Sequence, residues 1–136
     1  MSEPRAIERL QAAMGAFPQA ELLTQHYWAD GMYARELFRC ATTLIVGKVH
    51  RKEHFYIVAS GTVMITDGDA GPVEVHGPKV FVSNPGTKRA VYAVTDAVCI
   101  TVHRTAETDI ATLEAELVEP DTTSHYLPGN ILKALK

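Results

Sequence analysis

The chain has 136 residues, of which 46% are hydrophobic and 21% charged, and its formal net charge is −3. This length and balance are those of one ordinary globular domain that is long enough to bury a core. The slight negative charge gives no electrostatic reason to expect nucleic acid, no apolar run approaches the length of a membrane span, and a signal-peptide core is missing, so we expect a cytoplasmic protein without nucleic-acid or membrane partners.

The first part of the chain is predicted to be helical. Ile7, Leu10 and Met14 fall on one face of an amphipathic helix over residues 5–16. Pro18 follows this pattern closely and ends it. We interpret Leu22–Trp28 as a further helical turn, so residues 1–30 are expected to form an N-terminal helical extension.

From Met32 onward the apolar pattern changes to the period of two that is typical of strands. Turn-forming residues then recur at short intervals, as in Ser60-Gly61 and Asn84-Pro85-Gly86. Many short strands at this spacing predict an all-β sandwich or barrel over residues 31–104. We expect its strands near residues 42–50, 54–60, 62–66, 72–76, 79–83, 88–94 and 97–104.

Two cysteines, Cys40 and Cys99, both fall in predicted strands. Their spacing is that of neither a zinc knuckle nor a redox pair. In a reducing compartment we expect both to be free thiols of the core.

The C-terminal part returns to a helical period. Ile110, Leu113 and Leu117 share one face of a helix predicted over residues 105–117, and Pro120 stops it. The tail, residues 121–136, is expected to pack on the barrel or on a second subunit, because it carries several apolar side chains: Tyr126, Leu127, Ile131, Leu132 and Leu135.

Two histidines, His50 and His54, flank the charged residues 51–53 between two apolar runs. On one straight strand they would lie about 13 Å apart, too far to share an ion. On the two arms of a tight β-hairpin their Cβ atoms would lie about 5 Å apart. Both imidazoles can then reach one ion at about 2.1 Å. The alternative is that they are merely polar residues beside an exposed loop.

The segment from Gly47 to Gly61 resembles the first motif of the cupin superfamily. His50 stands where the second histidine of that motif is expected, His54 stands where its glutamate is expected, and Lys48 holds the place of its first histidine. The sequence Asn84-Pro85-Gly86-Thr87-Lys88-Arg89 is similar to the second cupin motif, with Arg89 at the position of its histidine.

The resemblance covers residues 31–104. It implies a cupin double-stranded β-helix (a jelly-roll barrel) with an N-terminal helix and a C-terminal helix plus tail. It also implies a divalent metal ion, with Fe, Mn, Ni and Zn not distinguished, and a homodimer. More narrowly, the chain looks like small uncharacterised cupin proteins that phages and bacteria encode.

Most cupin sites use three or four ligands, and His103 is the best candidate for the third. It shares a strand face with Cys99 and Thr101 and ends the last predicted strand. The alternative is a histidine that hydrogen-bonds to the following helix. Weaker candidates are Glu53, His26 and His76, whereas His125 is expected to lie on the surface.

Lys48 should point to the same side as His50, into the barrel. Arg89 cannot ligate a metal, because its guanidinium has no acceptor lone pair. If both line the cavity, they favour a small anionic ligand such as a carboxylate, an enolate or a phosphorylated metabolite. The alternative is that both are solvated. Tyr56 shares the inward parity of His54, as a proton donor, a pocket wall or a core residue.

The leading interpretation is a metal-dependent enzyme of oxygenase, isomerase or lyase type. The ion would be held by His50, His54 and His103, and Lys48, Arg89 and Tyr56 would bind the substrate. Two alternatives stay open, namely a non-catalytic cupin that binds or sequesters a small ligand, and a scaffold protein whose apolar tail contacts a partner. The sequence does not choose among the reactions, because the fold hosts many of them.

Overall fold

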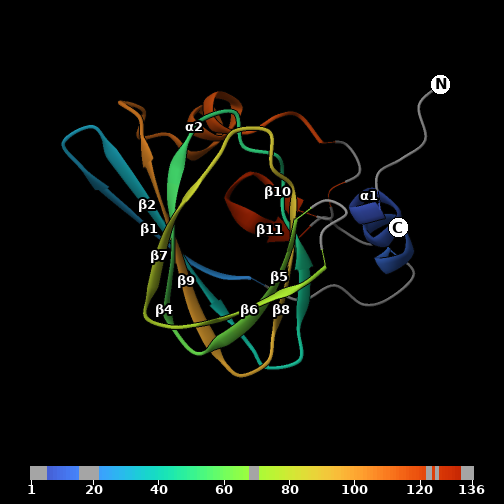
Figure 1. The fold of residues 1–136 in the computed structure, drawn as a ribbon. Coiled ribbons are helices and arrows are strands. Elements are labelled where there is room, and N and C mark those ends of the chain that lie inside the picture. The colour runs from blue at the N-terminus through green and yellow to red at the C-terminus, as the bar shows by residue number, and fades with distance from the viewer. Residues whose placement is uncertain (1–5, 16–21, 68–70, 122–123, 125, 133–136) are drawn as a thin grey trace.

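The computed structural model describes residues 6–15, 22–67, 71–121, 124 and 126–132. Two antiparallel sheets face each other, and helices lie at both ends of the chain (Figure 1). The helices are α1 (Ala6–Met14) and α2 (Ile110–Leu117), and a short 3-10 turn spans Pro128–Asn130. The strands are β1 (Leu23–Ala29), β2 (Met32–Arg39), β3 (Leu44–Val46), β4 (His54–Ser60), β5 (Thr62–Asp67), β6 (Val73–His76), β7 (Lys79–Ser83), β8 (Arg89–Ala93), β9 (Ala97–Arg104), β10 (Tyr126–Leu127) and β11 (Ile131–Leu132).

The first sheet has the order β1-β2-β9-β4-β7 and the second the order β3-β8-β5-β6. From β3 onward the chain passes repeatedly from one sheet to the other, which is the strand order of a jelly roll. β10 and β11 form a separate two-stranded ladder. The predicted all-β jelly roll with terminal helices is therefore confirmed.

The core lies between the two sheets, where alternate residues of each strand point inward. Tyr56, Val58 and Cys99 come from the first sheet and meet Val63 and Val91 of the second. The period of two in the sequence therefore corresponds to one buried and one exposed face of the sheets.

The helices and the tail cover the barrel at different places (Figure 1). α1 lies on the outside of the second sheet, where its Ile7 packs on Val46 and Ala90. At one end of the barrel, Leu113 of α2 packs on Tyr33 of β2. Tyr126 packs on Leu37 and Ile45, so this residue of the tail packs on the barrel.

Three local predictions were wrong. Residues around Leu22–Trp28 form β1 rather than a helical turn, because they pair with β2 along their whole length. Cys40 is not a core residue, because it is exposed and follows β2. Cys99 is buried as expected, and both cysteines are free thiols. The C-terminal helix begins at Ile110, because Asp109 caps it with a hydrogen bond from the Thr112 N–H to its side chain.

The predicted hairpin between His50 and His54 was also wrong. The strand expected over residues 42–50 is only β3, and β3 pairs with β8 in the second sheet. β4 belongs to the first sheet, where it pairs with β7 and β9. The segment between β3 and β4 therefore crosses from one sheet to the other at the end of the barrel.

The outer face of the first sheet exposes many apolar side chains. Tyr27 and Phe55 are each more than half exposed there. The face is lined by side chains that alternate with the inward ones: Leu23, Tyr27, Met32, Phe38, Phe55, Val80 and Val82.

Candidate metal centre

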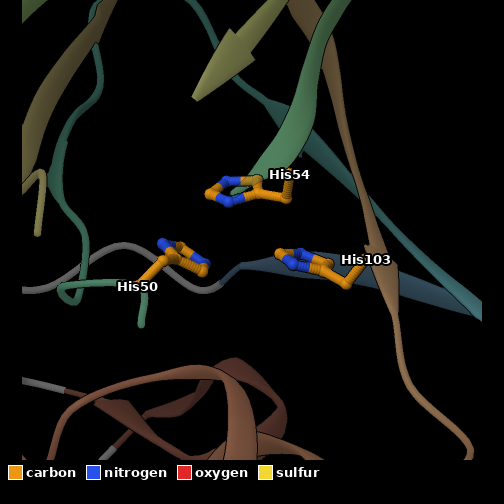
Figure 2. Close-up of side chains that lie close together, drawn as sticks. All are labelled: His50, His54 and His103. Atoms are coloured by element: carbon orange, nitrogen blue, oxygen red, sulfur yellow. The ribbon is translucent and has the colours of Figure 1, made fainter. Parts of the chain in front are cut away.

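Three histidine side chains converge at the end of the barrel that α2 covers (Figure 2). His50 comes from the segment between β3 and β4, His54 begins β4, and His103 lies near the end of β9. Their ring centroids are 4.3 Å (His50–His54), 4.5 Å (His54–His103) and 5.3 Å (His50–His103) apart. One nitrogen of each ring lies within 4.8 Å of the other two.

Strand pairing brings His54 and His103 together. Phe55 of β4 is paired with Val102 of β9, so the next pair outward along this antiparallel ladder is His54 with His103. Tyr33 of β2 is the partner of His103 on the other side. Histidines 49 positions apart in the sequence are thus neighbours on the inner face of the first sheet.

His50 is held by hydrogen bonds to two other parts of the chain. Its carbonyl accepts from the Gly86 N–H at 2.9 Å, and it forms a β-bridge with Val118 just after α2. On its two sides the Arg51 N–H donates to the Leu117 carbonyl at 2.7 Å, and the Val49 carbonyl accepts from the N–H of residue 119 at 2.8 Å. These bonds take the place of the predicted hairpin and place His50 beside His54.

Hydrogen bonds also orient the other two rings. Nδ1 of His54 lies 3.0 Å from the Lys52 carbonyl, which can only accept, so Nδ1 carries the proton and Nε2 keeps its lone pair. This Nε2 is buried and has no hydrogen-bond partner. Nε2 of His103 lies 2.9 Å from the Thr101 hydroxyl. A backbone or side-chain partner on the outer nitrogen is the usual way in which a metal-ligating histidine is oriented.

The three rings are held in the neutral form. Burial, followed by the nearness of His54 and His103, lowers the pKa of His50 to about 2. Burial and then the nearness of His54 lower the pKa of His103 to about 3. Burial also lowers the pKa of His54. Neutral imidazole is the form that binds metal, so the rings need not lose a proton first.

These shifts predict how the stability of the metal-free protein depends on pH. The unfolded chain takes up protons on these histidines below about pH 6.5, whereas the folded chain does not, so the unfolded state binds more protons and is favoured as the pH falls. We expect the free energy of unfolding to fall by about 2–3 kcal/mol per pH unit between pH 6.5 and 5, where carboxylates stay largely ionised. Urea unfolding at several pH values measures this slope.

The matched control for this pH series is His103→Gln, which removes one titrating ring and should flatten the slope. A free energy of unfolding that does not change between pH 6.5 and 5 would contradict the prediction.

The cluster fits a divalent transition-metal ion. Three nitrogens at about 2.1 Å from one ion and at tetrahedral or octahedral angles lie about 3–3.5 Å from one another, so small ring rotations bring the present nitrogens into range. The orphaned Nε2 of His54 is a buried acceptor that an ion would satisfy. Three neutral nitrogens leave further coordination positions for a ligand.

Next to the cluster lies a cavity of about 130 Å³ between the two sheets. His50 and His54 line it near α2, and Tyr56 and Arg39 line it deeper in the barrel. A protein cavity of about 150 Å³ accommodates benzene, so this cavity matches a molecule of about six non-hydrogen atoms.

The two cations expected in the pocket do line it, and both have acidic partners. Nζ of Lys48 lies 3.6 Å from Oε2 of Glu114. Nε of Arg89 lies 2.9 Å from Oδ1 of Asp67, and its Nη1 donates to the Ser83 hydroxyl at 2.5 Å. The Arg89 guanidinium also lies 5.5 Å from the ring centroid of Tyr56. Neither cation is solvated away from the barrel, and neither is a free charge.

Tyr56 faces inward, as its parity with His54 predicted. It is buried, and its ring stacks on Phe81 at 5.0 Å between centroids. Burial raises the pKa of its hydroxyl to about 12 despite the opposing Arg39, so Tyr56 stays protonated at neutral pH. It can donate a proton in a hydrogen bond, but it is a poor base.

Three cavity residues were missed from the sequence, namely Arg35, Arg39 and Glu114. Glu114 of α2 is only 4% exposed, and its Oε1 accepts from Nη2 of Arg35 at 2.5 Å. The sequence did contain a signal. Arg35 and Arg39 have the same parity along β2 as its inward apolar residues, and Glu114 falls on the apolar face of α2.

The weaker histidine candidates lie elsewhere. Nδ1 of His26 is 2.6 Å from the hydroxyl of Tyr33. His76 is exposed and lies 3.3 Å from Glu74. Glu53 is exposed and is not part of the three-histidine cluster. His125 lies outside the described residues.

No protein-family model and no curated protein sequence matches the chain, but solved structures do. A cupin superfamily protein from Desulfitobacterium hafniense aligns with a TM-score of 0.53 at 10% identity, over 69% of this chain and 86% of that one. An RmlC-like cupin from Shewanella frigidimarina aligns with a TM-score of 0.54 at 16% identity, over 65% and 80%. A DMSP lyase from Ruegeria pomeroyi aligns with a TM-score of 0.55 at 13% identity, over 65% of this chain and 50% of that one.

At such identities the likeness concerns the fold. The chain has the cupin fold, as the motifs around His50 and Arg89 predicted. Among the described residues, no helix is long and apolar enough to span a membrane.

Proposed function

We propose that this chain, a protein of cupin fold, binds one divalent metal ion through His50, His54 and His103 and acts on a small anionic molecule in the adjoining cavity. The observation that carries the proposal is the convergence of three buried imidazoles from three separate segments, with nitrogens within 4.8 Å of one another. When bound, such an ion supplies a Lewis acid with open positions for a ligand.

The chemistry of the cavity supports an anionic ligand. Its lining includes four cationic side chains but only one carboxylate, that of Glu114 among the described residues. A cavity with this excess of positive charge attracts an anion, and a divalent ion adds to the attraction. The reaction class, whether oxygenation, isomerisation or elimination, is a question for substrate screening because the fold hosts all three.

A second candidate function is the capture of a small ligand without turnover. Catalysis of a proton transfer needs a group that can take up a proton near neutral pH. Glu114, the one carboxylate of the lining among the described residues, is committed to Arg35 and Lys48, and the raised pKa of Tyr56 makes its hydroxyl a poor base. This observation favours a binding or sequestering protein, and an enzyme would then have to act through the ion itself.

The first experiment is to measure metal content. We expect the purified protein to take up close to one equivalent of Fe(II), Mn(II), Ni(II) or Zn(II), as elemental analysis after removal of excess ion will report. A protein that retains none of the four would contradict the metal-binding proposal. If metal binds, turnover of small carboxylates with and without oxygen separates the enzyme from the binding protein.

We propose further that the chain forms a homodimer through the apolar outer face of the first sheet. This face exposes uncharged side chains on β1, β4 and β7, among them Tyr27, Phe55 and Val82. A two-fold axis through the face would place these side chains against those of a second copy, and the Tyr27 hydroxyl already donates to the Glu36 carboxylate on the same face. Light scattering of the parent and of Phe55→Glu should give a dimer and a monomer respectively; a monomeric parent would contradict this.

A further inference from the structure

Of the four cations that line the cavity, Arg39 alone has no carboxylate partner among the described residues. Arg35 and Lys48 share Glu114, and Arg89 pairs with Asp67. Arg39 ends β2 and is only 8% exposed. Its Nε and Nη1 atoms are buried and have no hydrogen-bond partner.

The polar groups around Arg39 are neutral. Its Nη2 donates to the hydroxyl of Tyr56 over a long 3.5 Å, and the Cys99 thiol also lies beside it. Tyr126 lies close enough to sense its charge. Apolar side chains, among them Leu37, Ile45 and Val91, also line the cavity.

An arginine cannot discard its proton, so it remains a cation in this setting. A buried charge without a counter-charge is costly, and a buried N–H without an acceptor adds to that cost. A planar oxyanion in the cavity would reduce both costs, because a carboxylate accepts two parallel N–H bonds from a guanidinium. The nitrogen pairs that donate side by side are Nε with Nη2 and Nη1 with Nη2, so a carboxylate would take up one of the two unpaired nitrogens together with Nη2, whose present bond to the Tyr56 hydroxyl is long at 3.5 Å.

From these observations we infer that Arg39 is the anchor for the carboxylate of a small ligand, whose other end lies toward His50 and His54. This inference deepens the proposed function by naming the ligand class of the same cavity, and it does not depend on a bound metal. The Tyr56 hydroxyl lies 3.5 Å from Nη2 of Arg39 and can donate a further hydrogen bond to the same carboxylate.

The dimensions of the cavity fix the size of the ligand. Tyr56 lies two residues from His54 on the same face of β4, a rise of about 7 Å along the strand. With about 130 Å³ available, the ligand is a short acid of about six non-hydrogen atoms rather than a sugar nucleotide or a fatty acid.

The test uses the metal-free, chelator-treated protein and two short acids, propionate and butyrate. We expect both to raise the melting temperature and to bind in calorimetry, whereas propionamide and 1-propanol at the same concentrations do neither. In Arg39→Met the affinity for both acids should fall by about 10–100-fold. If the neutral analogues stabilise the protein as well as the acids do, or if chloride does, the inference is wrong.

Three variants distinguish Arg39 from Arg89 and from the metal site as the group that holds the carboxylate. Arg89→Met should weaken the binding of propionate less than Arg39→Met does, and loss of binding there but not in Arg39→Met would assign the carboxylate to Arg89 and overturn the inference. Arg39→Lys keeps the charge but loses the two-pronged donor, so it should bind propionate more weakly than the parent. His54→Ala should lose metal uptake, and without metal it should still bind propionate more tightly than Arg39→Met does, which makes failure of the metal site and failure of the carboxylate site distinguishable.

The melting temperature of the ligand-free variant separates a carboxylate anchor from a residue that serves folding alone. If Arg39 is an anchor, replacing this buried, unpaired cation by an apolar side chain of similar length removes a cost, so ligand-free Arg39→Met should melt at a higher temperature than the parent. A lower melting temperature together with unchanged binding of propionate would show that Arg39 is structural.

Discussion

Replacing His54 with alanine is expected to abolish stoichiometric metal uptake, lowering the affinity for a divalent ion by more than about 100-fold. Substitutions of groups that only orient a ligand already cost about 10–100-fold, and His54 offers its own nitrogen. Its Nε2 is the buried acceptor without a partner, and its Nδ1 proton is fixed by the Lys52 carbonyl. Competition with a chromophoric chelator measures the affinity, and His50→Ala should behave in the same way.

The control for both variants is His76→Ala. His76 is exposed on β6 and lies outside the three-histidine cluster, so its removal should leave the metal content unchanged. Circular dichroism checks that the variants are folded. Full metal content in His50→Ala and His54→Ala alike would rule out the cluster as the binding site.

Replacing Glu114 with alanine is expected to destabilise the protein by about 3–5 kcal/mol, which is the usual cost of removing one member of a buried ion pair. The carboxylate is 4% exposed and accepts from Arg35 at 2.5 Å and from the Gly129 N–H at 3.1 Å, with Lys48 at 3.6 Å. Without it, two cations and one backbone donor lose their acceptor. Urea unfolding measures the change.

Glu116→Ala is the matched control, two residues further along the same helix. Glu116 pairs with the exposed Lys52 at 2.7 Å and accepts from the Thr105 hydroxyl at 2.9 Å, and because an exposed pair contributes less than about 1 kcal/mol and a neutral hydrogen bond about 1 kcal/mol, its loss should cost less than the loss of Glu114. Similar losses of stability in the two variants would show that the buried ion pairs of Glu114 are not what stabilises this end of the barrel.

The sequence predicted the strands better than their partners. A period of two is a local property, and the expected strands over 54–60, 79–83 and 97–104 match β4, β7 and β9. Which strands pair is decided by packing between distant segments, and the hairpin between His50 and His54 was therefore wrong even though the two rings are neighbours. The proximity that the hairpin was meant to explain comes from hydrogen bonds to α2 and to Gly86.

One error could have been avoided. Asp30-Gly31 stands between two runs with strand-forming residues, and Asp-Gly is among the strongest signals for a two-residue hairpin turn. Both residues have positive φ, 31° and 75°, and the strands on either side pair from Ala29–Met32 outward. The helical interpretation of Leu22–Trp28 gave too little weight to this pair.

The charges of the cavity could be predicted only in part. The motif resemblance drew attention to Lys48 and Arg89, and both line the cavity. The sequence cannot show which cations have acidic partners, because Asp67 and Glu114 reach them from other strands and from a helix. The unpaired state of Arg39 is visible only once every partner among the described residues has been placed.

The segment that carries His50 is joined to the end of α2 by backbone hydrogen bonds on both of its sides. Arg51 adds a side-chain bond from its Nε to the Val118 carbonyl at 3.0 Å. A local unfolding event that detaches α2 therefore leaves the His50 backbone held by the Gly86 N–H, while His54 and His103 stay in the first sheet. Amide protons of residues 51, 118 and 119 should consequently exchange with solvent as one cooperative unit.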